Sequence, residues 1–193
     1  SDHEAALAAL GSSKALYALT GGVVDAEHVH AAALAKLSAA RSTFGTWART
    51  DPDERAVSLF ETAAGTMATH QDVIGPLDEA PDVPAGEFEI PSFEETAARL
   101  GGLLGWTLVT TATVEQTVDF FVGHADPDTA ATYRDLRADV EHLRDRTATT
   151  IDLDCESDRE WSTAETAASE VVDTAQAGYQ DTLAALDVDP DRE

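Results

Sequence analysis

The chain has 193 residues, with 37 acidic and 12 basic side chains and a formal net charge of −25. Nucleic-acid binding requires a basic patch that contacts phosphates, and we find no such patch in this acidic chain. The single cysteine, Cys155, excludes an intramolecular disulfide and a Cys-x-x-Cys metal knuckle.

The acidic residues are spread along the whole chain, and the only lysines are Lys14 and Lys36. Concentrated salt screens the repulsion that such a charge would cause. The composition therefore predicts a halophilic, in particular haloarchaeal, protein, and solubility in salt explains the acid better than a basic partner does. We find no signal peptide and no apolar run long enough to span a bilayer, so we expect a cytoplasmic protein without a membrane contact.

The N-terminal part is predicted to be helical. Residues 1–22 form one broken helix or two short ones, with the break at Gly11-Ser12-Ser13. Two long helices follow within 25–74, where apolar or small residues recur at spacings of three and four. Asp51 and Pro52 are expected to cap and begin the second of them. Its repeat places His70 on the buried face.

A linker is predicted over 75–92, long enough to cross a helix bundle before the next pair of helices. Segment 93–149 then holds a short helix, opened by a capping box at Ser92-Phe93-Glu94-Glu95, and two long helices. The short helix is expected to end at Gly101-Gly102. The buried face of the next helix is expected to carry Leu104, Leu108, Thr111, Val118 and Val122.

The last part of the chain follows the same pattern. Asp126 and Pro127 are expected to start the second long helix of this pair. Residues 150–158 are predicted to form a loop, and a final helix is expected over 157–187, opened by Ser157-x-x-Glu160 or by Ser162-x-x-Glu165. Because no segment alternates with a period of two, the sequence predicts an all-α protein with a single helical domain over 1–193.

Three stretches carry a resemblance to a known family. They are Leu10-Gly-Ser-Ser-Lys-Ala15, Ala40-Arg-Ser-Thr-Phe-Gly-Thr-Trp47, and Thr113 to Arg144 with its Phe120-Phe121 and Tyr133-Arg-Asp-Leu-Arg-Ala-Asp139. With two helices, a long crossover and two more helices, the chain resembles divergent haloarchaeal members of the rubrerythrin/ferritin-like family. The resemblance covers most of the chain. It implies a ferritin-like four-helix bundle with an extra N-terminal helical segment and a C-terminal helix.

The resemblance also indicates where metal ligands would lie. Metal-binding members place a Glu on the first and third helices of the bundle, and Glu-x-x-His on the second and fourth. In this chain Leu37 and Met67 stand at two of the glutamate positions. At most four ligands remain, and these are His70, Glu115, Asp139 and His142. Two carboxylates would compensate the charge of two iron ions poorly, so we expect no cofactor, with iron, manganese or zinc as the alternative.

Each of these four residues also has an ordinary structural interpretation. His70, on an apolar face, is more often a hydrogen-bonded core histidine than a ligand. Glu115 is interpreted either as the partner of an arginine or as an exposed residue. Asp139 and His142 are one helical turn apart and would form an exposed pair on a solvated flank.

The function we expect is therefore non-catalytic: a structural, regulatory or partner-binding role for a bundle whose diiron site has degenerated. The alternative is a metal-dependent oxidoreductase or peroxide-handling protein that uses the four candidate ligands. A third reading is a carrier with an apolar pocket between the helices of segment 93–149, near Gly101, Gly102 and Gly105. A homodimer and an unidentified protein partner are the associations to consider. Cys155 lies among acidic residues that would raise its thiol pKa, so it is a poor nucleophile.

Overall fold

The computed structural model describes residues 2–84 and 89–189, and every regular element within these residues is an α-helix. The prediction of an all-α fold is confirmed. The predicted break near Gly11 separates the first two helices. The elements are α1 (Asp2–Leu10), α2 (Ser13–Leu19), α3 (Ala26–Thr50), α4 (Glu54–Ile74), α5 (Thr96–Gly123), α6 (Pro127–Asp154) and α7 (Asp158–Ala185).

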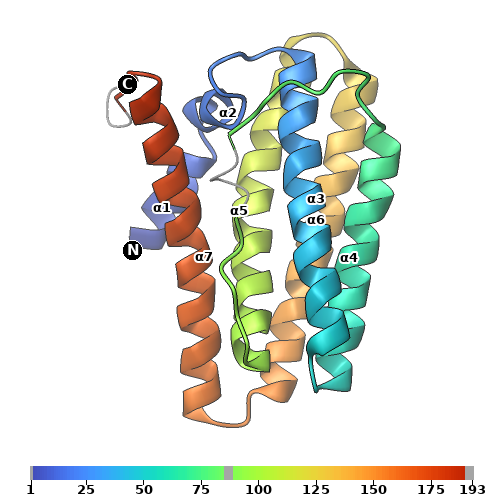
Figure 1. Cartoon of the computed structure of the whole chain (residues 1–193), viewed down its shortest axis with the longest axis vertical. Helices are drawn as coiled ribbons and strands as arrows, with labels where there is room; N and C mark the ends of the chain where they lie inside the picture. Colours follow the sequence, from blue (N-terminus) through green and yellow to red (C-terminus); the bar gives the residue numbers. More distant parts are fainter. Residues whose placement is uncertain (1, 85–88, 190–193) are drawn as a thin grey trace.

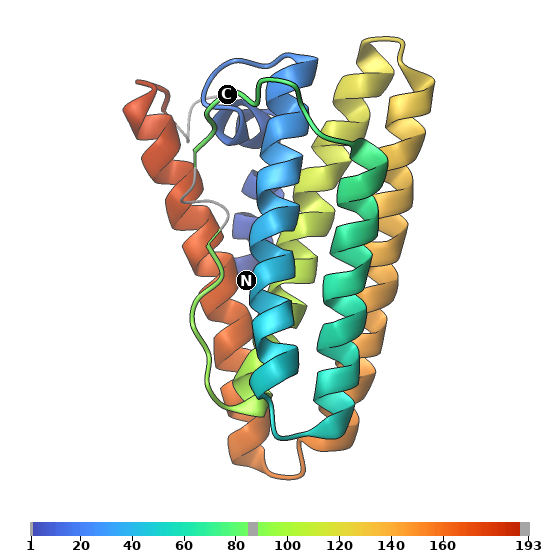
Figure 2. The same cartoon turned by 45° about the vertical axis from the view of Figure 1, so that its right-hand side comes forward.

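Two antiparallel helix pairs form the centre of the molecule (Figure 1). Helix α3 pairs with α4, and α5 pairs with α6, each across a short turn. After α4 the chain returns to the opposite end of the molecule, so α5 runs in the same direction as α4 (Figure 2). Helix α7 lies along α5 on the side away from α6. Helix α5 is therefore covered by α6 on one side and by α7 on another, so its buried surface is wider than one amphipathic face.

The main hydrophobic core lies between the two pairs. Phe44 of α3 meets Trp106 of α5 edge to face, with ring centroids 5.2 Å apart. Trp47 of α3 meets Phe60 of α4 in the same way at 5.4 Å. Such aromatic contacts add to the free energy gained by burying the rings. A second cluster, which includes Leu10, forms where α1 and α2 cover α5 and α7.

Side chains cap most of the long helices where the sequence predicts a start. Asp25 caps α3, Asp126 caps α6 with Pro127 in the first turn, and Ser157 forms a full capping box with Glu160. Helix α4 differs, because its cap is Asp53 rather than Asp51.

Asp51 instead turns inward. Its fully buried carboxylate accepts hydrogen bonds from Arg99 Nη1 at 3.0 Å and from Thr96 Oγ1 at 2.8 Å. An ion pair with α5 has taken the place of the predicted cap.

The predicted break at Gly101-Gly102 is wrong. Helix α5 is continuous from Thr96, and the proposed capping box at Ser92 is absent, since Glu95 is the N-cap and makes no side-chain cap bond. A Cβ atom on Gly101 would lie 2.0 Å from the carbonyl oxygen of Ala164 in α7. One on Gly105 would lie 2.6 Å from that of Ala168. These glycines allow the backbones of α5 and α7 to approach closely and do not end a helix.

Two further expectations need correction. Val122, predicted to be buried, is 51% exposed, and the buried face of α5 is centred on residues such as Leu103 and Thr110. Because α6 and α7 cover different sides of α5, its buried surface is wide and a one-face reading misplaces it. The predicted loop 150–158 is also shorter, since α6 continues to Asp154.

Candidate functional site

His70 and Asp139 lie on facing helices, α4 and α6, with their side chains in contact. The Nε2 atom of His70 is 2.7 Å from Oδ2 of Asp139. Since an ionised carboxylate only accepts hydrogen bonds, Nε2 carries the proton and donates it. The other ring nitrogen of His70, Nδ1, is buried and has no hydrogen-bond partner among the described residues.

The other two candidate ligands do not join this pair. Glu115 lies on the surface of α5, where its Oε1 is 3.4 Å from Nη1 of Arg137. His142 is exposed on α6. The predicted partner of His142, Asp139, is hydrogen-bonded to His70 instead. Within residues 2–84 and 89–189, no three His, Cys, Asp or Glu side chains gather in a way that could hold a metal ion.

The two positions that would carry glutamates in the metal-binding family are part of the core. Leu37 of α3 and Met67 of α4 are both fully buried. They belong to the same hydrophobic cluster as Val114 of α5 and Leu136 of α6. The interior between the helix pairs is therefore apolar at these positions.

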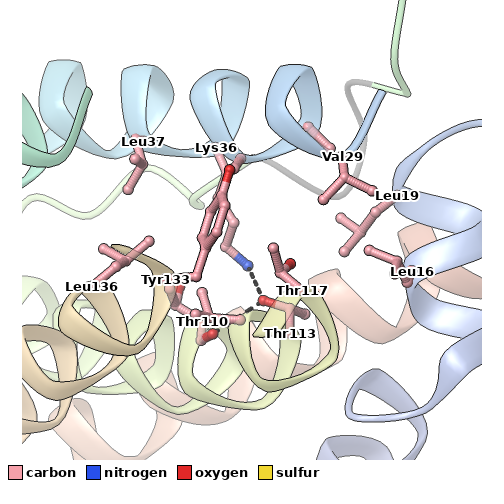
Figure 3. A pocket seen from close by; sticks show the side chains of 13 residues that line it. Leu16, Leu19, Val29, Lys36, Leu37, Thr110, Thr113, Thr117, Tyr133 and Leu136 are labelled. Atoms are coloured by element: carbon pink, nitrogen blue, oxygen red, sulfur yellow. Dashed lines mark hydrogen bonds between the residues drawn. The ribbon is translucent and has the colours of Figure 1, made fainter. Parts of the chain in front are cut away.

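A small cavity opens beside this apolar layer, between α3, α5 and α6 and under α2 (Figure 3). The centre of a water molecule can move through about 30 Å³ of it. Its wall is mainly aliphatic, with a few polar groups. The lining residues are Leu16, Leu19, Val29, Ala32, Ala33, Lys36, Leu37, Thr110, Thr113, Val114, Thr117, Tyr133 and Leu136.

Lys36 brings an ammonium group into this interior. Its side chain reaches from α3 toward α5, where Nζ donates a hydrogen bond of 3.2 Å to Oγ1 of Thr113 (Figure 3). The residue is only 7% exposed. Thr113 in turn donates to the carbonyl oxygen of Thr110 at 3.1 Å. Lysine is seldom this deeply buried, because removing its charge from water is unfavourable.

Thr110, Thr117 and Tyr133 bring the other hydroxyl groups of the wall. Thr110 is 1% exposed, and its Oγ1 has no hydrogen-bond partner in the described part of the chain. The hydroxyl of Tyr133 lies 2.8 Å from Nδ1 of His30. Burial raises the pKa of Tyr133. Burial also lowers the pKa of His30, although the charge of Asp126 acts in the opposite direction. Both shifts favour a neutral pair in which the phenol donates to the imidazole.

Cys155 shows no sign of a nucleophilic role. It is buried at the end of α6, and this burial is the main cause that raises its thiol pKa. The charges of Glu160 and Asp154 add to the effect. The direction agrees with the sequence-based prediction, although burial contributes more than the acidic neighbours. A thiol with a raised pKa is mostly protonated at neutral pH and reacts slowly.

Lys36 is the residue that reasoning from the sequence missed. One signal was present: the chain has only two lysines, and this one stands among alanines and leucines on the helix 26–50. A solvent-exposed lysine is far more common, so the pattern alone did not indicate burial. Gly101 and Gly105, expected to let the helices of segment 93–149 approach closely, face α7 instead and do not line this cavity.

Comparison with known protein families, curated proteins and solved structures finds no match for this chain. Among the helices of residues 2–84 and 89–189, none combines the length and the apolar character that crossing a membrane requires.

Proposed function

We propose that this chain is a ferritin-like helical bundle whose dimetal site has degenerated, with a non-catalytic structural, regulatory or partner-binding role. The course of the chain supports the fold. Helices α3 and α4 are antiparallel, one long crossover follows, and α5 and α6 are antiparallel again. A single crossover between two hairpins is the connectivity of ferritin-like bundles.

The main observation that supports the loss of the metal site is that the interior of the bundle is apolar. Leu37 and Met67 are fully buried where the family resemblance would have glutamates. Glu115 pairs with Arg137 at the surface, which leaves one histidine and one carboxylate in contact across the bundle. Two ligands with one negative charge cannot balance two divalent cations in an apolar interior.

The partner-binding form of this role has one supporting feature. Trp161 of α7 is 46% exposed and belongs to an apolar groove with Leu104 and Leu108 of α5. Exposed apolar surface of this kind is typical of association sites. A second copy of the chain is the partner we propose, which light scattering tests. The wild type should be dimeric and Trp161→Ser monomeric; a monomeric wild type would rule the homodimer out.

Metal content tests the main proposal. We would purify the protein at high KCl without chelator and determine iron, manganese and zinc by elemental analysis. The proposal expects a folded, helical protein with far less than one metal ion per chain. It also expects no heat of binding when Fe²⁺ is titrated anaerobically. This titration distinguishes a protein that lost its metal during purification from one that has no metal site.

The variant His70→Ala is the matched control. Near-stoichiometric metal that disappears in this variant would overturn the proposal. It would favour the metal-dependent oxidoreductase instead, with His70 and Asp139 as its remaining interhelical ligands.

A further inference from the structure

We infer that Tyr133 and His30 form a site of reversible one-electron oxidation, in which the tyrosine gives up the electron and the histidine receives the phenolic proton. The inference goes beyond the proposed function and does not depend on it. It rests on the hydrogen bond between the two side chains, on the burial of the phenol and on the surroundings of the imidazole.

The two side chains join α6 to α3. Tyr133 reaches from α6 toward α3 (Figure 3), and its hydroxyl lies 2.8 Å from Nδ1 of His30. In the neutral pair the phenol donates this hydrogen bond and Nδ1 accepts it. The rings of His30 and Phe121 stack with centroids 5.0 Å apart, and Phe121 stacks on Tyr133 at 5.5 Å. These ring contacts hold the proton donor and the proton acceptor in place.

Burial makes it unfavourable to remove the proton and the electron of the phenol in separate steps. Tyr133 is 1% exposed. Burial raises the pKa of Tyr133, so the phenolate does not form first at neutral pH. Loss of the electron first would leave a radical cation in an apolar interior, where an unsolvated charge is costly. Joint transfer avoids both species, because a neutral phenoxyl radical stays in the core and the positive charge passes to the histidine.

The imidazole is suited to receive this charge. His30 is half-buried, so its protonated ring keeps contact with water. Burial lowers the pKa of His30, but the charge of Asp126 acts in the opposite direction and favours the protonated ring. The positive charge therefore forms near the surface and near a carboxylate. The radical on Tyr133 is meanwhile shielded by the core from water and from other radicals.

A one-electron oxidant from solution, such as a peroxyl radical, balances the reaction. The O–H bond of Tyr133 breaks, the proton forms a new N–H bond at Nδ1 of His30, and the electron passes to the peroxyl radical. The resulting peroxide anion takes a proton from water and becomes a hydroperoxide. A one-electron donor reverses the change, since the returned electron draws the proton back from His30 to the phenolic oxygen.

Flash photolysis of the full chain tests the inference, with photogenerated ruthenium(III) tris-bipyridyl as the oxidant. The background carries Tyr17→Phe and Trp161→Phe, because these more accessible rings would compete for the oxidant. We expect a phenoxyl radical, identified by its absorption and by electron paramagnetic resonance. Tyr133→Phe should remove this signal. A signal that survives Tyr133→Phe unchanged would overturn the inference.

A second buried tyrosine provides the matched control. Tyr179 of α7 is 3% exposed, and none of the histidine hydrogen bonds in the described residues involves it. Tyr179→Phe should therefore keep the radical signal. A radical that Tyr179→Phe removes would show that burial alone, without a base, selects the oxidised tyrosine, and would contradict the inference.

The rate of oxidation tests the part of His30. His30→Gln should slow the oxidation of Tyr133 by about a hundredfold or more, because a positioned proton acceptor contributes that much. His124→Gln, at an exposed histidine near the end of α5, should leave the rate unchanged. Equal rates in the wild type and His30→Gln would overturn the inference. If His30→Gln does not fold, the wild-type histidine is tested in D₂O, where the rate should fall and an unchanged rate would contradict joint transfer.

Discussion

The imidazole of His70 and the carboxylate of Asp139 join α4 to α6 through one hydrogen bond of 2.7 Å, and its two ends lie in different surroundings. The His70 side chain is 6% exposed, whereas that of Asp139 is 59% exposed. The carboxylate therefore keeps much of its hydration, and the histidine fills core volume. The value of this pair to the fold should come from packing more than from charge.

Substitutions at the two ends of this pair should have unequal effects. Asp139→Ala should lower the free energy of unfolding by less than about 1 kcal/mol, because the Asp139 end of the bond is 59% exposed and water can replace the carboxylate there. His70→Ala should lower it by about 2 kcal/mol or more, because it leaves a cavity. His70→Leu, which keeps the volume and removes the unpartnered Nδ1, should stay within about 1.5 kcal/mol of wild type. Urea unfolding measures all three. Equal losses for Asp139→Ala and His70→Ala would show that the bond itself dominates.

Two helix glycines should respond to alanine in opposite directions. Gly101→Ala places a Cβ against the backbone of Ala164 and should destabilise the protein by about 2 kcal/mol or more. Gly65→Ala, on α4, meets no atom within 4 Å and should stabilise it by about 0.5–1 kcal/mol through helix propensity. The difference in melting temperature between the two variants is the measurement. A neutral Gly101→Ala would contradict the close approach of α5 and α7.

The buried pair of Asp51 and Arg99 should be far more sensitive than a surface pair. Asp51→Ala leaves Arg99, whose side chain is 11% exposed, without this carboxylate, and should destabilise the protein by about 3 kcal/mol. Asp145→Ala removes a surface partner of Arg144 and should change stability by less than about 1 kcal/mol. Chemical denaturation of both variants makes the comparison. A loss below about 1 kcal/mol for Asp51→Ala would mean that the pair contributes little.

The half-buried His30 should make the protein less stable as the pH falls. Burial lowers its pKa below the ordinary value of 6.5, so near that pH the unfolded chain binds more protons than the folded one. The free energy of unfolding should therefore decrease as the pH falls through the unfolded-state pKa of His30. Unfolding experiments between about pH 7.5 and about pH 5.5 cover this range and lie above most carboxylate pKa values.

Variants identify the histidine responsible for this dependence. His30→Gln should reduce the slope of stability against pH. His124→Gln, at an exposed histidine near the end of α5, should preserve it. A slope that is the same in the wild type and His30→Gln would exclude His30 as its source.

The local rules of helix formation were readable in the sequence. The spacing of apolar residues on α3 and α4 indicates which face of each helix is buried, and it places His70 on the buried face of α4. Caps such as Asp25 and Ser157 mark helix starts, because the first backbone N–H groups of a helix need an acceptor nearby. These properties depend on residues within one or two turns of each other, so the sequence contains them directly.

Other features depended on what each helix meets in space. Gly101 looks like a helix end in the sequence, and only the neighbouring Ala164 gives it a packing role. Glu115, a candidate ligand by the family resemblance, lies on the surface of α5 beside Arg137 of α6. Lys36 is buried, and its Nζ donates a hydrogen bond to Thr113 on another helix.

The sequence by itself determined the all-α character and the places where most helices begin, since propensity, periodicity and capping act over a few residues. Tertiary structure alone decided which candidate ligands meet and where the cavity lies. The contact of His70 with Asp139 spans 69 positions of the chain, and that of Lys36 with Thr113 spans 77. The rotation and crossing of whole helices fix such contacts, and no local pattern records them.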